Sequence, residues 1–124
     1  MTAVVPGAAT ELADAIVNLD FERARGLLDP EIDFRGMTPN RVWEADGPDE
    51  VEMAMRKWLQ NPEREVESVE VTSSEVVEDT ARVGWRVRGQ RTEGPFSFEQ
   101  QAYVRENEGR IVWLRVMCTG PRPA

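Results

Sequence analysis

Residues 81–90 read ARVGWRVRGQ, and their side chains alternate between apolar and polar along the chain. The odd-numbered positions are apolar or glycine, with Trp85 at their centre, whereas the even-numbered positions include three arginines. Alternation with a period of two is typical of a β-strand that is buried on one face only. The stretch therefore predicts a strand whose Trp85 side faces the interior and whose arginine side faces outward.

Similar alternation continues on both sides of this stretch. It predicts four long strands, at 65–78, 80–91, 95–106 and 110–118, with a β-bulge near Ser68–Val69 where the pattern slips. The connections between these strands are short and contain Glu-Asp, Thr-Glu-Gly and Asn-Glu-Gly, which are typical of tight turns. Strands joined by such turns are antiparallel neighbours, so we expect a meander.

The first half of the chain shows helical patterns instead. We expect helices at 11–19 (capped by Thr10), at 21–28 (capped by Asp20) and from Pro48 to about residue 60. Between the last two, 31–36 is expected as a short strand and 37–47 as an irregular loop. Helices followed by an antiparallel sheet indicate an α+β domain, in which helices pack on a strongly curved antiparallel sheet that forms a cone.

Length and composition favour a single domain over 1–124, with 1–9 a loose N-terminal segment and 119–124 a loose C-terminal tail. The formal charge of −8 argues against nucleic acid and anionic membrane surfaces as partners. One cysteine excludes an internal disulfide, and no stretch resembles a signal peptide or a membrane-spanning helix. We therefore expect a cytoplasmic protein without nucleic-acid or membrane partners.

The residue types limit the available chemistry. The chain has no histidine, which excludes Ser–His and Cys–His nucleophile pairs and zincin motifs, and it has no phosphate-binding glycine-rich loop. Acidic residues at 29, 31 and 33 are spaced like the start of a calcium loop, but Phe34 stands where glycine is required. We expect neither metal nor cofactor. Asp33 and Arg35 are candidate catalytic residues, because they share one side of a short strand; the alternative is a surface ion pair.

The aromatic residues and one amide suggest a ligand pocket. Trp58 lies on the apolar stripe of the third expected helix, and Gln100 is the only polar residue on the apolar side of its strand. Core packing is the alternative for the tryptophans, and a small buried apolar group is the alternative for Cys118. We expect a cavity for a small apolar or aromatic ligand between the sheet and the third helix, with Trp43 at its mouth, lined by Phe34, Trp58, Trp85, Phe98, Gln100, Leu114, Val116 and Cys118.

Three segments in this order, LDFERARGLLDPEIDF, GPDEVEMAMRKWL and GRIVWLRVM, resemble the nuclear transport factor 2-like (cystatin-like) superfamily, and within it the SnoaL-like polyketide cyclase branch. The resemblance covers nearly the whole chain and implies the cone fold. Gapless matching places Leu12 and Gly36 at the catalytic positions of ketosteroid isomerases. It places Val87, Gly89 and Val116 at those of limonene epoxide hydrolases. Neither catalytic mechanism can therefore be transferred, and whether the chain is an enzyme at all stays open.

The resemblance also implies that the concave face of the sheet lines the pocket and that the convex face pairs with a second subunit. Arginine, tyrosine, tryptophan and methionine interspersed with acids are typical of a protein interface. We therefore expect a homodimer through Arg86, Arg88, Glu99, Gln101, Tyr103, Trp113, Arg115 and Met117.

Two functional hypotheses follow. The first is a SnoaL-like small-molecule-pocket protein, which would be a cofactor-free isomerase, cyclase or hydrolase if it is an enzyme. The second is a non-catalytic dimeric interaction module whose cavity is vestigial or filled by side chains. An open, partly polar cavity favours the first hypothesis.

Overall fold

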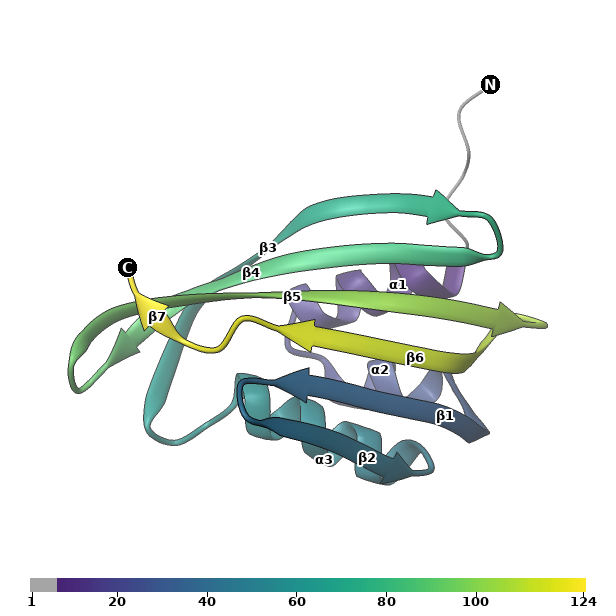
Figure 1. Ribbon diagram of the computed structural model, residues 1–124, viewed down its shortest axis with the longest axis horizontal. Helices are drawn as coiled ribbons and strands as arrows, with labels where there is room; N and C mark the ends of the chain where they lie inside the picture. The colour runs from purple at the N-terminus through teal and green to yellow at the C-terminus, as the bar shows by residue number, and fades with distance from the viewer. Residues whose placement is uncertain (1–6) are drawn as a thin grey trace.

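The alternating second half of the chain forms four long antiparallel strands, as predicted. The computed structural model describes residues 7–124 (Figure 1) and places these strands at β3 (Arg64–Val77), β4 (Thr80–Arg91), β5 (Gly94–Asn107) and β6 (Arg110–Cys118). The expected bulge near Ser68 is present as a register shift between Val66 and Ser68. A second shift follows between Val71 and Ser73, so β3 bends twice along β4.

The first half of the chain supplies three helices and a hairpin, namely α1 (Gly7–Val17), α2 (Phe21–Gly26), β1 (Leu28–Thr38), β2 (Arg41–Asp46) and α3 (Pro48–Leu59). The Asp20 side chain caps α2 as expected, because it accepts a hydrogen bond of 3.1 Å from the backbone N–H of Arg23. Pro48 opens α3. α1, however, begins at Gly7 rather than after Thr10.

Two predictions in this half were wrong. Residues 37–47 are not an irregular loop, because 41–46 form β2, which pairs with β1 around a turn at Pro39-Asn40. Asn40 has a φ of 65°, which asparagine tolerates better than most residues. Leu28 begins β1 rather than ending α2. Pro30 therefore lies within a strand, at an irregularity between Leu28 and Asp33 where the pairing with β6 is interrupted.

The strands form one sheet in the order β2-β1-β6-β5-β4-β3, and the helices lie against one face of it (Figure 1). The α+β cone fold is confirmed, although the sheet is mixed rather than wholly antiparallel. β1 pairs with β6 in parallel, with Phe34 facing Leu114 and Gly36 facing Val116. The reason is that β1 and β6 are linked through most of the chain rather than through a tight turn.

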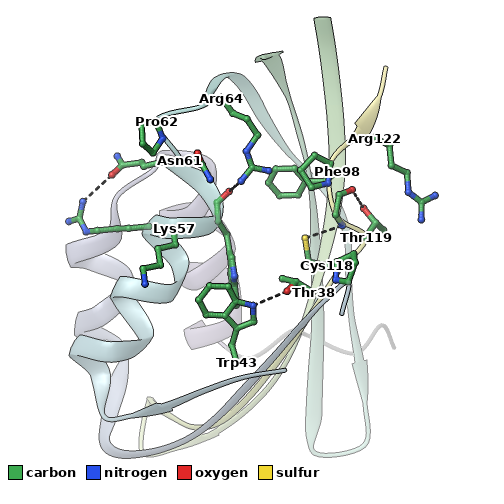
Figure 2. Close-up of a pocket in the computed structure, with 16 residues that line it drawn as sticks. Thr38, Trp43, Lys57, Asn61, Pro62, Arg64, Phe98, Cys118, Thr119 and Arg122 are labelled. Atoms are coloured by element: carbon green, nitrogen blue, oxygen red, sulfur yellow. Dashed lines mark hydrogen bonds between the residues drawn. The ribbon is translucent and has the colours of Figure 1, made fainter. Parts of the chain in front are cut away.

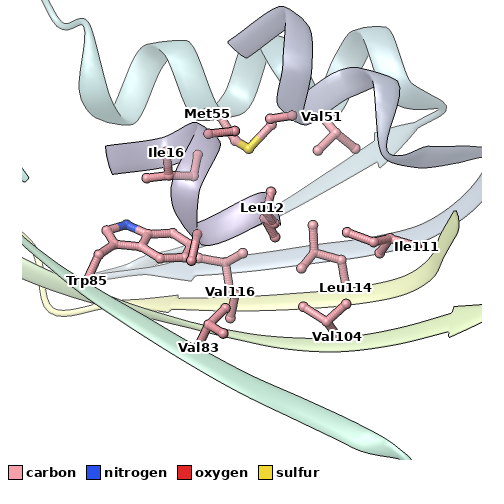
Figure 3. Packing of buried hydrophobic residues seen from close by; sticks show 14 of the residues in the cluster. Leu12, Ile16, Val51, Met55, Val83, Trp85, Val104, Ile111, Leu114 and Val116 are labelled. Atoms are coloured by element: carbon pink, nitrogen blue, oxygen red, sulfur yellow. The ribbon is translucent and has the colours of Figure 1, made fainter. Parts of the chain in front are cut away.

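The core lies between the helices and the concave face of the sheet (Figure 3). Leu12 and Ile16 of α1 and Met55 of α3 meet the apolar rows of β4, β5 and β6, and all are buried. Trp85 belongs to this core and is 2% exposed. The face of the alternating stretch 81–90 that carries Trp85 is thus the inner face, as its pattern predicted.

The two ends of the chain differ from the loose segments that we expected. Residues 1–6 lie outside the described residues, but 7–9 already belong to α1, and Ala8 and Ala9 are buried. In the tail, Arg122 and Pro123 form β7, which pairs with Ser97 and Phe96 of β5. This pairing holds residues 119–123 against the end of the cone.

No helix within residues 7–124 is both long and apolar enough to cross a membrane.

Candidate functional site

A cavity of about 770 Å³ opens at the end of the cone where β5, β6 and α3 approach one another (Figure 2). This volume lies within the range of about 300–1,000 Å³ that is common for small-molecule sites. Its wall comes from the β1–β2 hairpin, the C-terminal half of α3, the start of β3, one β5 residue and the segment after β6. The lining residues are Thr38, Pro39, Trp43, Arg56, Lys57, Trp58, Gln60, Asn61, Pro62, Arg64, Phe98, Cys118, Thr119, Gly120, Pro121 and Arg122.

Aromatic rings form the apolar part of this wall. Trp43 of β2 and Trp58 of α3 meet edge to face, with ring centroids 5.7 Å apart and an interplanar angle of 87°. The Trp43 indole N–H donates a 2.8 Å hydrogen bond to Oγ1 of Thr38, which fixes its orientation (Figure 2). Phe98 of β5 lines the cavity from the sheet side. A flat apolar ligand can therefore contact rings on two sides.

Trp58 closes the inner end of the cavity. Its ring lies over Gly36 of β1, where an added Cβ would stand 2.6 Å from Cη2 and 2.7 Å from Cζ2 of the indole. Phe34 packs beside it, with ring centroids 6.1 Å apart. Because glycine has no side chain, the indole fills the space above β1, and the interior beyond Trp58 belongs to the core.

The charged residues of the lining are all basic. They are Arg56, Lys57, Arg64 and Arg122, and no residue among the described lining residues is acidic. Arg56 forms an ion pair of 2.8 Å with Glu52, one turn earlier on α3. Lys57, Arg64 and Arg122 form no ion pair within residues 7–124. Positive charge without a counter-charge therefore remains at the mouth.

Arg64 is the cation most closely built into the wall. Its Nη2 donates to the backbone carbonyl of Trp58 at 3.4 Å, and its guanidinium lies 5.6 Å from the Phe98 ring centroid (Figure 2). Burial lowers the pKa of Arg64 below its ordinary value, and the like charge of Arg91 acts in the same direction. The nearby Cys118 and Glu63 oppose this shift. The partly desolvated guanidinium therefore lacks a full counter-charge.

Cys118 lies at the end of β6 and lines the cavity. Its side chain is half-buried, and Sγ accepts a hydrogen bond of 3.4 Å from the backbone N–H of Gly120. It is thus neither a fully buried apolar group nor part of a nucleophile pair. It is a thiol that a ligand in the cavity would cover.

The expected pocket and the observed cavity overlap only at the mouth. Trp43, Trp58, Phe98 and Cys118 line the cavity. The other five expected residues are buried behind it without lining it, namely Phe34, Trp85, Gln100, Leu114 and Val116. The side chains of α1 and α3 fill the inner end of the cone, which sequence alternation alone does not reveal.

Gln100, expected to orient a ligand, is bonded within the core instead. The Trp85 indole N–H donates a 2.8 Å hydrogen bond to Oε1 of Gln100, while Nε2 of Gln100 has no partner among the described residues. Gln100 is 1% exposed and cannot meet a ligand in this arrangement. The polar groups at the cavity come from elsewhere.

The candidate catalytic residues lie on the opposite face of the sheet from the cavity. Asp33 pairs with Arg115 of β6, with Oδ1 and Nη2 3.0 Å apart, and Arg35 pairs with Glu44 of β2 at 3.7 Å. Both therefore belong to ion pairs, although not with each other. This placement removes them from the site.

Sequence interpretation missed the basic residues of the mouth. Arg64 had a detectable signal, because it shares the alternation of the inward-facing Val66 on β3. Lys57 follows Arg56 beside the apolar stripe of α3, and Arg122 lies in the segment expected to be loose. The latter two carried no local signal, since their position depends on how the chain ends approach each other.

The convex face carries the residues expected at a dimer surface. Trp113 is half-buried between the guanidinium groups of Arg105 and Arg115, which lie 4.4 and 4.5 Å from its ring centroid. Arg86 pairs with Glu70 and Glu99 at 3.5 and 3.6 Å. These contacts all occur within one chain.

An apolar hollow of about 300 Å³ lies on this convex face. Met37 of β1, Val42 of β2 and Met117 of β6 line it and are 46%, 59% and 52% exposed. Met37 and Val42 were not among the expected surface residues, because 37–47 had been interpreted as a loop. Tyr103 lines the same hollow, together with Arg35, Arg115 and Val116.

Comparison with known proteins gives the fold. No family model and no curated protein matches the sequence. Among solved structures, a nuclear transport factor 2-like (NTF2-like) protein from Burkholderia thailandensis is similar with a TM-score of 0.72 and 16% identity, over 94% of this chain and 92% of that one.

A protein from Catenulispora acidiphila with a ketosteroid isomerase-like fold, solved with trimethylamine, has a TM-score of 0.68 and 14% identity, over 91% of this chain and 85% of that one. An LEH-like epoxide hydrolase from M. tuberculosis has a TM-score of 0.62 and 14% identity, over 90% and 79%. The expected nuclear transport factor 2-like fold is therefore confirmed. Sequence identities this low indicate a shared fold but not a shared activity.

Proposed function

We propose that this protein binds a small aromatic or apolar molecule in the cavity at the mouth of the cone. The observation that carries the proposal is the cavity of about 770 Å³ walled by Trp43, Trp58 and Phe98. Aromatic walls combined with a few polar groups are typical of small-molecule sites. The nearest alternative use of the same residues, a filled core, does not fit a cavity of this size.

Binding rather than a named reaction is the function that the lining supports. Apart from its arginines, the titratable lining residues within 7–124 are Lys57 and Cys118. The positions matched to known catalytic residues hold Leu12, Gly36 and Val87, which are apolar or lack a side chain. The chain thus shares a fold with isomerases and epoxide hydrolases but presents none of their matched side chains at the cavity.

Indole N–H signals in ¹H–¹⁵N NMR spectra test the proposal. Biphenyl-4-carboxamide, a neutral aromatic probe, is expected to shift the signals of Trp43 and Trp58 and leave Trp113 unchanged, because Trp113 lies on the opposite face. Trp43→Ala should weaken binding about tenfold, since one aromatic contact is lost. Trp113→Ala is the matched control and should keep the affinity. Shifts confined to Trp113, or absent from all four indoles, would contradict the proposal.

A second proposal concerns assembly. We propose that the convex face pairs with a second copy of the chain, because it combines the exposed Met37, Val42 and Met117 with alternating acids and arginines. A face that carries both charges beside an apolar centre is self-complementary across a two-fold axis. This surface would serve the interaction-module function if no small molecule binds in the cavity.

Met117→Glu is expected to convert the dimer to monomer without unfolding the chain, because residue 117 is exposed in one subunit but would become buried in the pair. Sedimentation velocity at micromolar concentration measures the change. Met53→Glu on α3 is the matched control, since Met53 is 57% exposed and lies away from the sheet. An unmutated protein that sediments as a monomer would overturn the assignment of this face.

A further inference from the structure

The protein carries an excess of acidic residues, yet most of its cations without an ion pair among the described residues lie at or beside the cavity; Arg88 and Arg110 are the exceptions. Of the 15 lysine and arginine residues, nine form ion pairs with carboxylates. Three that form none among the described residues, Lys57, Arg64 and Arg122, line the cavity. A fourth, Arg41, lies with its guanidinium carbon 3.4 Å from the ring centroid of Trp43. If charged residues were distributed at random in this chain, which has more acidic than basic residues, some acidic residues would line the cavity as well.

The cations surround the aromatic wall rather than lying apart from it. Nζ of Lys57 is 5.9 Å from the Trp43 ring centroid, and Arg41 lies against the same ring. Arg64 lies at the opposite wall, against the rings of Phe96 and Phe98 at 5.8 and 5.6 Å. An aromatic body held between these walls would therefore have a positive group at either edge (Figure 2).

Arg64 is the partly buried cation of the cavity that contacts no negatively charged group. Its guanidinium is partly buried, and its contacts are one carbonyl oxygen and two ring faces, none of which carries a full negative charge. Burial without a counter-charge destabilises the charged form, which is why the pKa of Arg64 is lowered. A carboxylate can accept two parallel hydrogen bonds from a guanidinium and would supply the missing charge.

We propose that the ligand is an aromatic carboxylate, whose rings lie against Trp43 and Phe98 and whose carboxylate pairs with Arg64. This inference rests on the proposed binding function and adds the charge of the ligand to it. Lys57 and Arg122 contribute positive potential at the mouth, where the low polarity of the wall strengthens their effect. The acidic remainder of the protein disfavours anions elsewhere on its surface.

Matched probes separate the two proposals. Biphenyl-4-carboxylate and 2-naphthoate are each compared with their neutral amides by isothermal titration calorimetry at 50 mM NaCl. Each carboxylate is expected to bind about tenfold or more tightly than its amide, because a charge-assisted pair replaces a neutral contact. The preference should narrow as NaCl is raised to 500 mM, since salt screens the mouth cations.

Arg64→Gln should remove most of this preference by weakening the carboxylates, while the affinity of the amides changes less than about twofold. Arg110→Gln is the control, because Arg110, like Arg64, forms no ion pair among the described residues, but it is exposed and lies at the end of β6 far from Cys118 and the cavity. The Arg110→Gln variant should still bind each carboxylate more tightly than its amide by the same factor as the unmutated protein. Lys57→Gln is expected to give a smaller loss than Arg64→Gln, since Lys57 is exposed to solvent.

The outcomes are distinct. If the amides bind as tightly as the carboxylates, or Arg64→Gln leaves the preference intact, the assignment of an anionic ligand is wrong and the aromatic cavity stands. If neither member of any pair binds, the cavity itself is not a ligand site and both proposals are lost.

Discussion

Gly89→Ala is expected to destabilise the protein by more than about 3 kcal/mol, because overpacking against backbone cannot be relieved by a side-chain rotation. Gly89 lies on the inner face of β4 opposite the bulged part of β3. An added Cβ would overlap the backbone carbonyl oxygen of Glu65 and stand 2.9 Å from Cε1 of Phe96. Urea unfolding followed by tryptophan fluorescence measures the loss as a lower midpoint.

Gly26→Ala is the matched control. Gly26 is the last residue of α2, and a Cβ there meets no atom within 4 Å. Alanine is the better helix former by about 1 kcal/mol, so this variant should be as stable as the unmutated protein or slightly more stable. Equal midpoints for Gly89→Ala and the unmutated protein would show that β3 does not approach β4 as closely as described.

Trp58 and Gly36 should be strongly coupled in stability. Trp58→Ala is expected to cost about 3–5 kcal/mol, as removal of a buried aromatic ring does. Gly36→Ala should cost about 2–3 kcal/mol in the unmutated protein, because its Cβ would enter the indole ring. In the Trp58→Ala background the same Gly36→Ala change should cost less than about 1 kcal/mol, since the obstructing ring is absent.

A double-mutant cycle by urea unfolding measures this coupling, which we expect to be about 2 kcal/mol. Gly36→Ala/Leu59→Ala is the matched comparison, because Leu59 is equally buried on α3 and is not among the atoms closest to position 36. Additive costs in the Trp58 cycle would mean that the indole does not lie over Gly36. The cavity would then extend farther into the cone than its present lining indicates.

Alternation was sufficient to predict the long strands and the face that each turns to the core. Trp85 and Gln100 were placed correctly on the concave side, because the period of a strand fixes the direction of every second residue. Alternation does not specify how far α1 and α3 reach across that face. The two residues were therefore expected in a pocket, whereas they form a buried hydrogen-bonded pair.

β2 shows that a short strand is difficult to predict from alternation. Its six residues carry only Trp43 and Ala45 on the inner side, which is too short a pattern to distinguish a strand from a loop. The turn residues Pro39 and Asn40 are the stronger signal for this hairpin, because proline and asparagine are both common in tight turns. Without β2 the convex hollow cannot be predicted either, because Val42 of β2 lies opposite Met37 across the hairpin and both residues line the hollow.

The parallel pairing of β1 with β6 has a consequence for the order in which the molecule folds. It joins Phe34 to Leu114 and Gly36 to Val116, so residues roughly eighty positions apart must meet before the sheet is continuous. Until β1 pairs with β6, the β1–β2 hairpin and the β3–β6 meander are separate units with unpaired edges. Closing so long a chain segment is entropically costly, and it slows folding toward the range of roughly milliseconds to seconds. The exposed edges of β1 and β6 are then the places where intermolecular strand pairing competes with folding.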